Sequence, residues 1–104
     1  MKKIMLACSA GMSTSLLVTK MEQAAEKVGD EVEIFALPMS DGINRLSTVD
    51  CVLLGPQVRL NLGKIKEEAA KVNPGLPVDV IDMKDYGMMN GEKVYNYAKK
   101  LMDE

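Results

Sequence analysis

The apolar residues of this chain fall into two kinds of pattern that alternate along its length. Short runs that are apolar over nearly all their positions are typical of strands buried on both faces of a sheet. Four such runs occur, at residues 3–7, 32–37, 51–54 and 78–81. The second run contains Glu33, which indicates an edge position with one wetter side.

Between these runs, apolar residues recur every three or four positions, as on one face of a helix. The spacing predicts a helix from about Thr14 to Val28, with Gly29 as its C-terminal stop, and a second helix over residues 58–72. A last helix follows Asn90, a residue type that suits an N-cap. The apolar positions are Leu17, Met21, Ala24, Ala25 and Val28; Val58, Leu62, Ile65, Ala69 and Val72; and Val94, Tyr97, Ala98 and Leu101.

Two other stretches carry weaker patterns. In residues 40–48, Asp41 and Gly42 indicate a turn, whereas Ile43 and Leu46 fit one or two helical turns. After the fourth apolar run, residues 85–87 and 90–91 indicate a loop.

Strands that alternate with helices predict an α/β fold, a four-stranded parallel sheet with helices on both faces. A length of 104 residues suits a single domain over residues 1–104. Ligands of such sheets bind outside the carboxyl ends of the strands. The loops at residues 8–15, 55–57 and 83–91 reach that edge.

The loop after the first strand carries the candidate chemistry. Cys8 is the last residue of that strand, and Ser9, Ala10, Gly11, Met12, Ser13, Thr14 and Ser15 follow it. Small residues let backbone N–H groups turn inward, and the start of a helix adds unpaired N–H donors with a partial positive charge. Such a site stabilises a thiolate, so Cys8 is a candidate nucleophile. The Ser and Thr residues also suit a helix cap, and the two roles are compatible because both use the same N–H groups.

Composition removes several classes of function. The net charge of −2 and the scarcity of aromatic residues give no reason to expect a nucleic-acid partner. The absence of histidine removes catalysis by Ser-His-Asp or Cys-His and the usual zinc sites, and nothing indicates a metal or another cofactor. No apolar run could span a bilayer, and the first run reads as a strand rather than as part of a signal peptide. We therefore expect a soluble cytoplasmic protein with reduced thiols.

The remaining candidates have an ordinary structural explanation beside a functional one. Cys51 lies in an apolar strand, at the end away from the loops, and fits a buried structural role. Pro56 and Gln57 either make a plain turn or form a wall of the site. Tyr86 is either a loop residue or a contact for a phosphoryl group or a partner, and an exposed Met12 would suit a protein contact.

A thiolate among N–H donors suggests a phosphocysteine intermediate. Low-molecular-weight tyrosine phosphatases use the pattern C-x5-R, in which the arginine grips the phosphoryl group. Thr14 occupies the arginine's position here, and Arg45 and Arg59, the only arginines, lie outside the loop. The Walker pattern is also absent, which disfavours nucleotide binding. The residues thus favour a carrier that passes the phosphoryl group on without hydrolysing it.

The sequence CSAGMSTSLL at residues 8–17 closely resembles the phosphorylation loop of the enzyme IIB component of bacterial sugar phosphotransferase systems (PTS), in the lactose/cellobiose (chitobiose) class. The resemblance continues through LLGPQ at residues 53–57, VID at residues 80–82 and DYG at residues 85–87, and it covers essentially the whole chain. It implies a IIB-type domain with a flavodoxin-like or phosphatase-like sheet, which we expect in the strand order 2-1-3-4.

The resemblance also implies a function. Cys8 would take a phosphoryl group from a phosphohistidine of the IIA component and pass it to a disaccharide, such as cellobiose, chitobiose or lactose, at the membrane IIC component. Such a protein is a phosphohistidine–sugar phosphotransferase. Residues 9–15 would hold the phosphoryl group, Pro56, Gln57 and Tyr86 would lie on the rim with Ala10 and Met12, and the carrier would be a monomer.

Two other functions stay open at this point. One is a phosphatase-like or arsenate-reductase-like hydrolase that uses the same cysteine loop. The missing arginine and the lack of a second suitable thiol count against it. The other is a regulatory module that senses phosphorylation.

Overall fold

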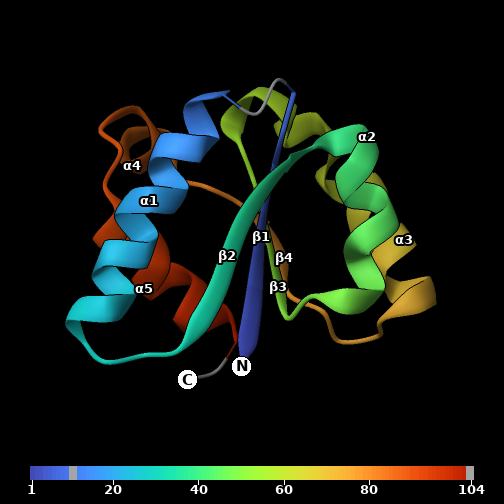
Figure 1. Ribbon diagram of the computed structural model, residues 1–104. Coiled ribbons are helices and arrows are strands. Elements are labelled where there is room, and N and C mark those ends of the chain that lie inside the picture. The colour runs from blue at the N-terminus through green and yellow to red at the C-terminus, as the bar shows by residue number, and fades with distance from the viewer. Residues whose placement is uncertain (10–11, 103–104) are drawn as a thin grey trace.

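The computed structural model describes residues 1–9 and 12–102, and its centre is one parallel sheet. The strands are β1 (Lys2–Cys8), β2 (Val32–Pro38), β3 (Cys51–Leu54) and β4 (Val78–Val80). They lie in the order β2-β1-β3-β4 (Figure 1). The predicted α/β class and the order 2-1-3-4 are therefore confirmed, and each strand lies within one residue of its predicted bounds at either end.

Helices cover both faces of the sheet (Figure 1). On one face lie α1 (Met12–Lys27), α4 (Met83–Gly87) and α5 (Gly91–Leu101). On the other lie α2 (Met39–Gly42) and α3 (Leu62–Val72). Two 3₁₀ segments, η1 (Ile43–Thr48) and η2 (Pro56–Asn61), complete the chain.

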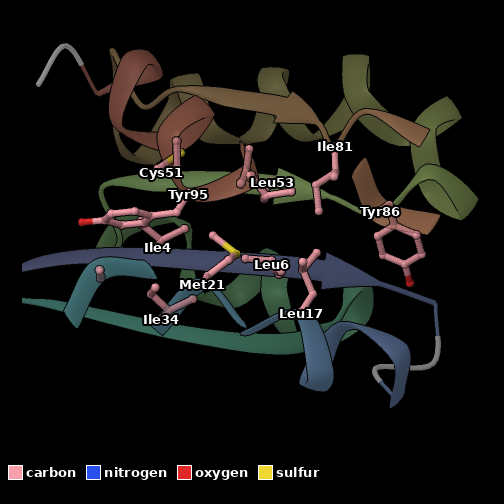
Figure 2. Close-up of a cluster of buried hydrophobic side chains, with 13 residues drawn as sticks. Ile4, Leu6, Leu17, Met21, Ile34, Cys51, Leu53, Ile81, Tyr86 and Tyr95 are labelled. Carbon is pink, nitrogen blue, oxygen red and sulfur yellow. The ribbon is translucent and has the colours of Figure 1, made fainter. Parts of the chain in front are cut away.

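The central strand β1 divides the apolar core into two halves, because successive side chains of a strand point to opposite faces. Ile4 and Leu6 join the half beneath α1 and α5 (Figure 2), whereas Met5 and Ala7 join the half beneath α3. By the same alternation, Cys8 lies on the α1 side of the sheet.

Three local predictions were wrong, because short helices occupy two stretches predicted as turn or loop and because Val58, at φ −114° and ψ 21°, interrupts the helix predicted over residues 58–72. Residues 85–87 form most of α4 instead of a loop, and the Asp82 carboxylate caps that helix by accepting the N–H groups of Lys84 and Asp85, each at 3.1 Å. Asp41 and Gly42 belong to α2 instead of a turn. The helix predicted to begin at residue 58 begins at Leu62, after the η2 segment.

Some apolar residues at helical spacing are exposed. Tyr97 was predicted on the buried face of the last helix, but Tyr95 is buried there and Tyr97 is 36% exposed. Val28 and Val72, at the last positions of their predicted helices, are also exposed. Helix ends project beyond the sheet, so a residue there can keep the helical period and still face solvent.

The helices α1 and α5 pack so closely that one position has no room for a side chain. A Cβ atom added at Gly91 would lie 2.4 Å from the backbone carbonyl carbon of Lys20 and 2.6 Å from its oxygen. Gly91 is the first residue of α5, and the neighbouring Asn90 side chain accepts the N–H of Lys93. The glycine therefore sets the distance between the two helix backbones.

We expect Gly91→Ala to lower the free energy of unfolding by about 2 kcal/mol, because α5 must move away from α1 and its buried contacts loosen. Urea denaturation followed by circular dichroism measures this change.

Gly63→Ala is the matched control. Gly63 lies inside α3, and an added Cβ meets nothing within 4 Å. This variant should be more stable by roughly 0.5–1 kcal/mol, since alanine is the better helix former. Equal effects of the two substitutions would contradict the close-contact explanation.

Candidate functional site

The candidate site lies at the carboxyl end of β1, where Cys8 is held from both sides. Cys8 pairs with Pro38 of β2, and on the other side the N–H of Gly55 donates to the carbonyl of Ala7 at 2.8 Å. The Cys8 residue is only 3% exposed. The neighbouring ends of β2 and β3 therefore fix the position of the Cys8 backbone and restrict that of its thiol.

One side-chain partner of the thiol comes from the first turn of α1. The Sγ atom of Cys8 lies 3.1 Å from the Oγ1 atom of Thr14, within hydrogen-bonding distance, and Thr14 is fully buried. The first turn of α1 contains no acidic residue, so nothing within it offsets the partial positive charge of the helix N-terminus. A thiolate at this position would therefore receive a hydroxyl donor and a favourable dipole.

Gly55 forms a wall beside the thiol. A Cβ atom at this glycine would lie 3.4 Å from the Cβ of Cys8 and 2.9 Å from Oε1 of Gln57. The missing side chain lets the turn after β3 close against Cys8.

The turn after β3 and the helix α4 are joined by a hydrogen bond between two predicted rim residues. Nε2 of the exposed Gln57 donates to the hydroxyl oxygen of Tyr86 at 3.3 Å. Tyr86 is buried except for 8% of its surface, and its ring packs at the end of the core near Leu17 (Figure 2). Pro56 is buried as well. Of these three predicted rim residues, Gln57 alone offers an exposed side chain.

The structure describes only part of the predicted phosphoryl-binding loop. Ser9 is exposed and follows β1, whereas Ala10 and Gly11 lie outside the described residues. Met12 and Ser13 open α1, and Ser15 is exposed, with its carbonyl accepting the hydroxyl of Thr19 at 3.3 Å. The described parts agree with the predicted order of strand, loop and helix N-terminus.

The second thiol lies in a different environment. Cys51 begins β3 and pairs with Ile4 near the start of β1, at the other end of the core from Tyr86 (Figure 2). It is fully buried, and burial, together with the nearby carboxylates of Asp79 and Asp50, raises the pKa of the Cys51 thiol to about 12. Cys51 is therefore a neutral core side chain at physiological pH.

The described residues contain no group of three or more His, Cys, Asp or Glu side chains that could hold a metal ion. Over the same part of the chain, no helix is long and apolar enough to cross a membrane.

The chain matches a family of known function over nearly its whole length. Residues 3–97 match the family described as "PTS system, Lactose/Cellobiose specific IIB subunit". The chain belongs to this family. IIB components are sugar phosphotransferases in general, and they work with IIA and IIC components.

Curated members of the IIB family align with almost the entire chain. An oligo-beta-mannoside-specific EIIB component of Bacillus subtilis (strain 168) is 47% identical, and a cellobiose-specific EIIB component of Lactococcus lactis subsp. lactis (strain IL1403) is 49% identical. Each alignment covers 98% of this chain and 97% of the relative.

Solved IIB structures share the fold. The cellobiose-specific IIB protein of Borrelia burgdorferi has a TM-score of 0.79 and is 36% identical, with 98% of this chain and 92% of that chain covered. The lactose-specific IIB domain of Streptococcus pneumoniae has a TM-score of 0.84 with 95% of each chain covered, and at 16% identity it shows the fold alone.

Two features of the candidate site were not predicted from the sequence. One is the Asp82 cap, which positions α4 and with it Tyr86. An aspartate directly after an apolar strand is a helix-start signal that could have revealed it. The other is the Gln57–Tyr86 hydrogen bond, which joins residues 29 positions apart and leaves no signal in local spacing.

The raised pKa of Cys51 predicts a pH dependence of stability. In the unfolded chain the thiol ionises near its ordinary value of about 8.5, whereas in the folded chain it stays neutral up to about 12. The folded chain then binds more protons than the unfolded chain, so the stabilisation present below pH 8.5 is lost as the pH rises.

We expect the free energy of unfolding of the wild type to fall by about 2 kcal/mol more than that of Cys51→Ala between pH 8 and pH 10. Urea titrations in a reducing buffer measure both. Parallel pH curves for the two proteins would show that Cys51 ionises normally in the folded chain.

Proposed function

We propose that Cys8 is the phosphoryl carrier of this IIB component. It accepts the phosphoryl group from a phosphohistidine of the IIA component and passes it to a sugar at the membrane IIC component. The observation that carries the proposal is the position of the Cys8 thiol, fixed at the end of the central strand and 3.1 Å from a hydroxyl in the first turn of α1. The chain has no histidine of its own, so the donor histidine must belong to another protein.

Each half of the relay is an in-line displacement at phosphorus. In the first, the Cys8 thiolate attacks, the S–P bond forms, the N–P bond breaks, and its electron pair remains on the imidazole of the donor. In the second, a sugar hydroxyl attacks, the O–P bond forms, the S–P bond breaks, and its electron pair returns to sulfur while the hydroxyl proton passes to a base on the acceptor side. Such transfers depend mainly on positioning and charge stabilisation, which a fixed thiol in a polar loop supplies.

We assign the phosphoryl-binding role to the backbone N–H groups of the loop at residues 9–15, with help from the hydroxyls of Ser13 and Ser15. Thr14 receives a separate role, because its hydroxyl approaches the sulfur rather than open space. A hydroxyl that donates to the departing thiolate stabilises it while the S–P bond breaks. No metal or cofactor takes part in this mechanism.

The acceptor sugar is a disaccharide of the cellobiose, chitobiose or lactose kind; the family description, with lactose and cellobiose, and the cellobiose-specific relative support this choice. The carrier is a cytoplasmic monomer whose residues 1–104 form one IIB-type domain. Both partners reach the same sulfur, so the two share one contact surface in turn. Gln57 contributes its exposed side chain to this surface, and the buried Pro56 and Tyr86 support it from beneath.

The first test is phosphorylation followed by intact mass. Incubation with phosphoenolpyruvate, the general phosphotransferase proteins and a cognate IIA component should add one phosphoryl group to the wild type and to Cys51→Ala, and none to Cys8→Ser. The Cys51→Ala protein is the matched control, because it removes the other thiol. Lack of phosphorylation by a fully charged IIA, or hydrolysis of a chromogenic phosphate ester by the wild type, would favour the hydrolase instead.

A second test addresses Thr14 without any partner. In a Cys51→Ala background, we expect Thr14→Val to slow the alkylation of Cys8 by iodoacetamide at pH 7 about tenfold, because a hydrogen bond to a charged group stabilises it by roughly 1.5–3 kcal/mol. Thr14→Ser keeps the hydroxyl and should react at nearly the wild-type rate. If valine and serine gave the same rate, the hydroxyl would have no part in activating the thiol.

A further inference from the structure

The outer edge of β4 has no neighbouring strand among the described residues. In the described residues, β4 is the last strand of the sheet and pairs with β3 alone. The N–H of Val52 donates to the carbonyl of Pro77, and the N–H of Ile81 donates to the carbonyl of Leu54. Because backbone groups alternate in direction along a strand, those of Val78 and Val80 point away from β3. An open edge of this kind is a template for pairing with another strand.

One carboxylate occupies this edge. The N–H of Val80 donates to Oδ1 of the neighbouring Asp79 at 2.8 Å, so one of the two outward N–H groups is already satisfied. The hydroxyl of Tyr97, on α5, donates to the other oxygen, Oδ2. The Asp79 side chain is thereby held over the backbone of its own strand.

The tyrosine keeps its proton over the whole physiological range. The hydrogen bond to Asp79 is the main cause that raises the pKa of Tyr97 to about 12, and partial burial adds to it. The hydroxyl therefore stays a donor at any ordinary pH.

A cavity lies on each side of this edge. A cavity of about 520 Å³ lies on the α5 side and is lined by residues that include Val80, Asp82 and Tyr97. A second cavity, of about 410 Å³, is lined by residues that include Val78, Asp79 and Leu101. The two cavities have room for the alternating side chains of an added strand, so neighbouring side chains do not block the edge by their size.

We propose that Asp79 and Tyr97 form a latch that closes the open edge of β4 against pairing with a second copy of this chain. A second copy is the natural occupant, because two identical edges can pair about a two-fold axis with matching donors and acceptors. In antiparallel pairing centred on the middle residue of β4, Asp79 would face its own symmetry mate. The two like charges would repel, and each carboxylate would have to leave the N–H of Val80.

Sedimentation equilibrium of the full chain at increasing concentration tests the latch. Asp79→Val removes the charge and both oxygens, and should dimerise with a dissociation constant at least about tenfold lower than that of the wild type. Tyr97→Phe removes only the hydroxyl that holds the carboxylate, and should fall between the two. Amide hydrogen exchange of Val78 and Val80 should slow in the dimer of Asp79→Val, because these groups become paired.

Tyr95→Phe is the matched control. It also removes a tyrosine hydroxyl that donates to a carboxylate, that of Asp30 at 2.7 Å, but away from β4. Its association should equal that of the wild type.

The proposal is overturned if Asp79→Val and Tyr97→Phe associate no more tightly than the wild type, or if their dimers leave the exchange of Val78 and Val80 unchanged. Should Asp79→Val fail to fold, Asp79→Asn, which loses the charge and keeps one acceptor oxygen, takes its place with Tyr97→Phe. None of these outcomes depends on the chemistry of Cys8.

Discussion

The pairing of β1 on both of its edges and the burial of both of its faces are the constraint on which the site depends. β2 and β3 hold the strand from either side, and two separate halves of the core cover it. A strand held in this way cannot slip by one residue without exchanging its two sets of apolar side chains. The position of Cys8 at its end is therefore set by the whole core.

The two thiols show how strongly position in the sheet decides chemistry. Cys51 begins its strand beneath apolar side chains and near carboxylates, and its neutral form is favoured. Cys8 ends its strand beside the Thr14 hydroxyl and the N-terminus of α1, and both groups favour a negative charge in their neighbourhood. Parallel strands place all their carboxyl ends at one edge of the sheet, so the fold itself separates the polar site from the apolar core.

Most of the fold was readable from the sequence, and so was the position of Cys8 at the end of the first strand. The inner strands β1 and β3 are buried on both faces, and that environment leaves continuous apolar runs in the sequence. The single charged residue Glu33 marked β2 as an edge strand, as the structure confirms.

Local sequence patterns did not reveal the parts of the structure that depend on capping or on distant contacts. The short helix α4 is fixed by Asp82, so the turn-forming residues inside it were misleading. Tyr97 kept the helical period but lies at the outer edge of the sheet, where its hydroxyl meets Asp79. The Gln57–Tyr86 pair joins two loops whose approach follows from the strand order, which periodicity along the chain cannot reveal.

The register of the sheet also has a consequence for oxidation. Cys51 pairs with Ile4, and Cys8 lies four residues farther along the same strand. At a rise of about 3.3 Å per residue, the two thiols are separated by roughly 13 Å along the sheet, well beyond the reach of a disulfide. An oxidised Cys8 thus has no internal thiol to trap it, and any disulfide that it forms must join it to a separate molecule. Its return to the reduced state is then set by the thiol pool around the protein and not by the fold.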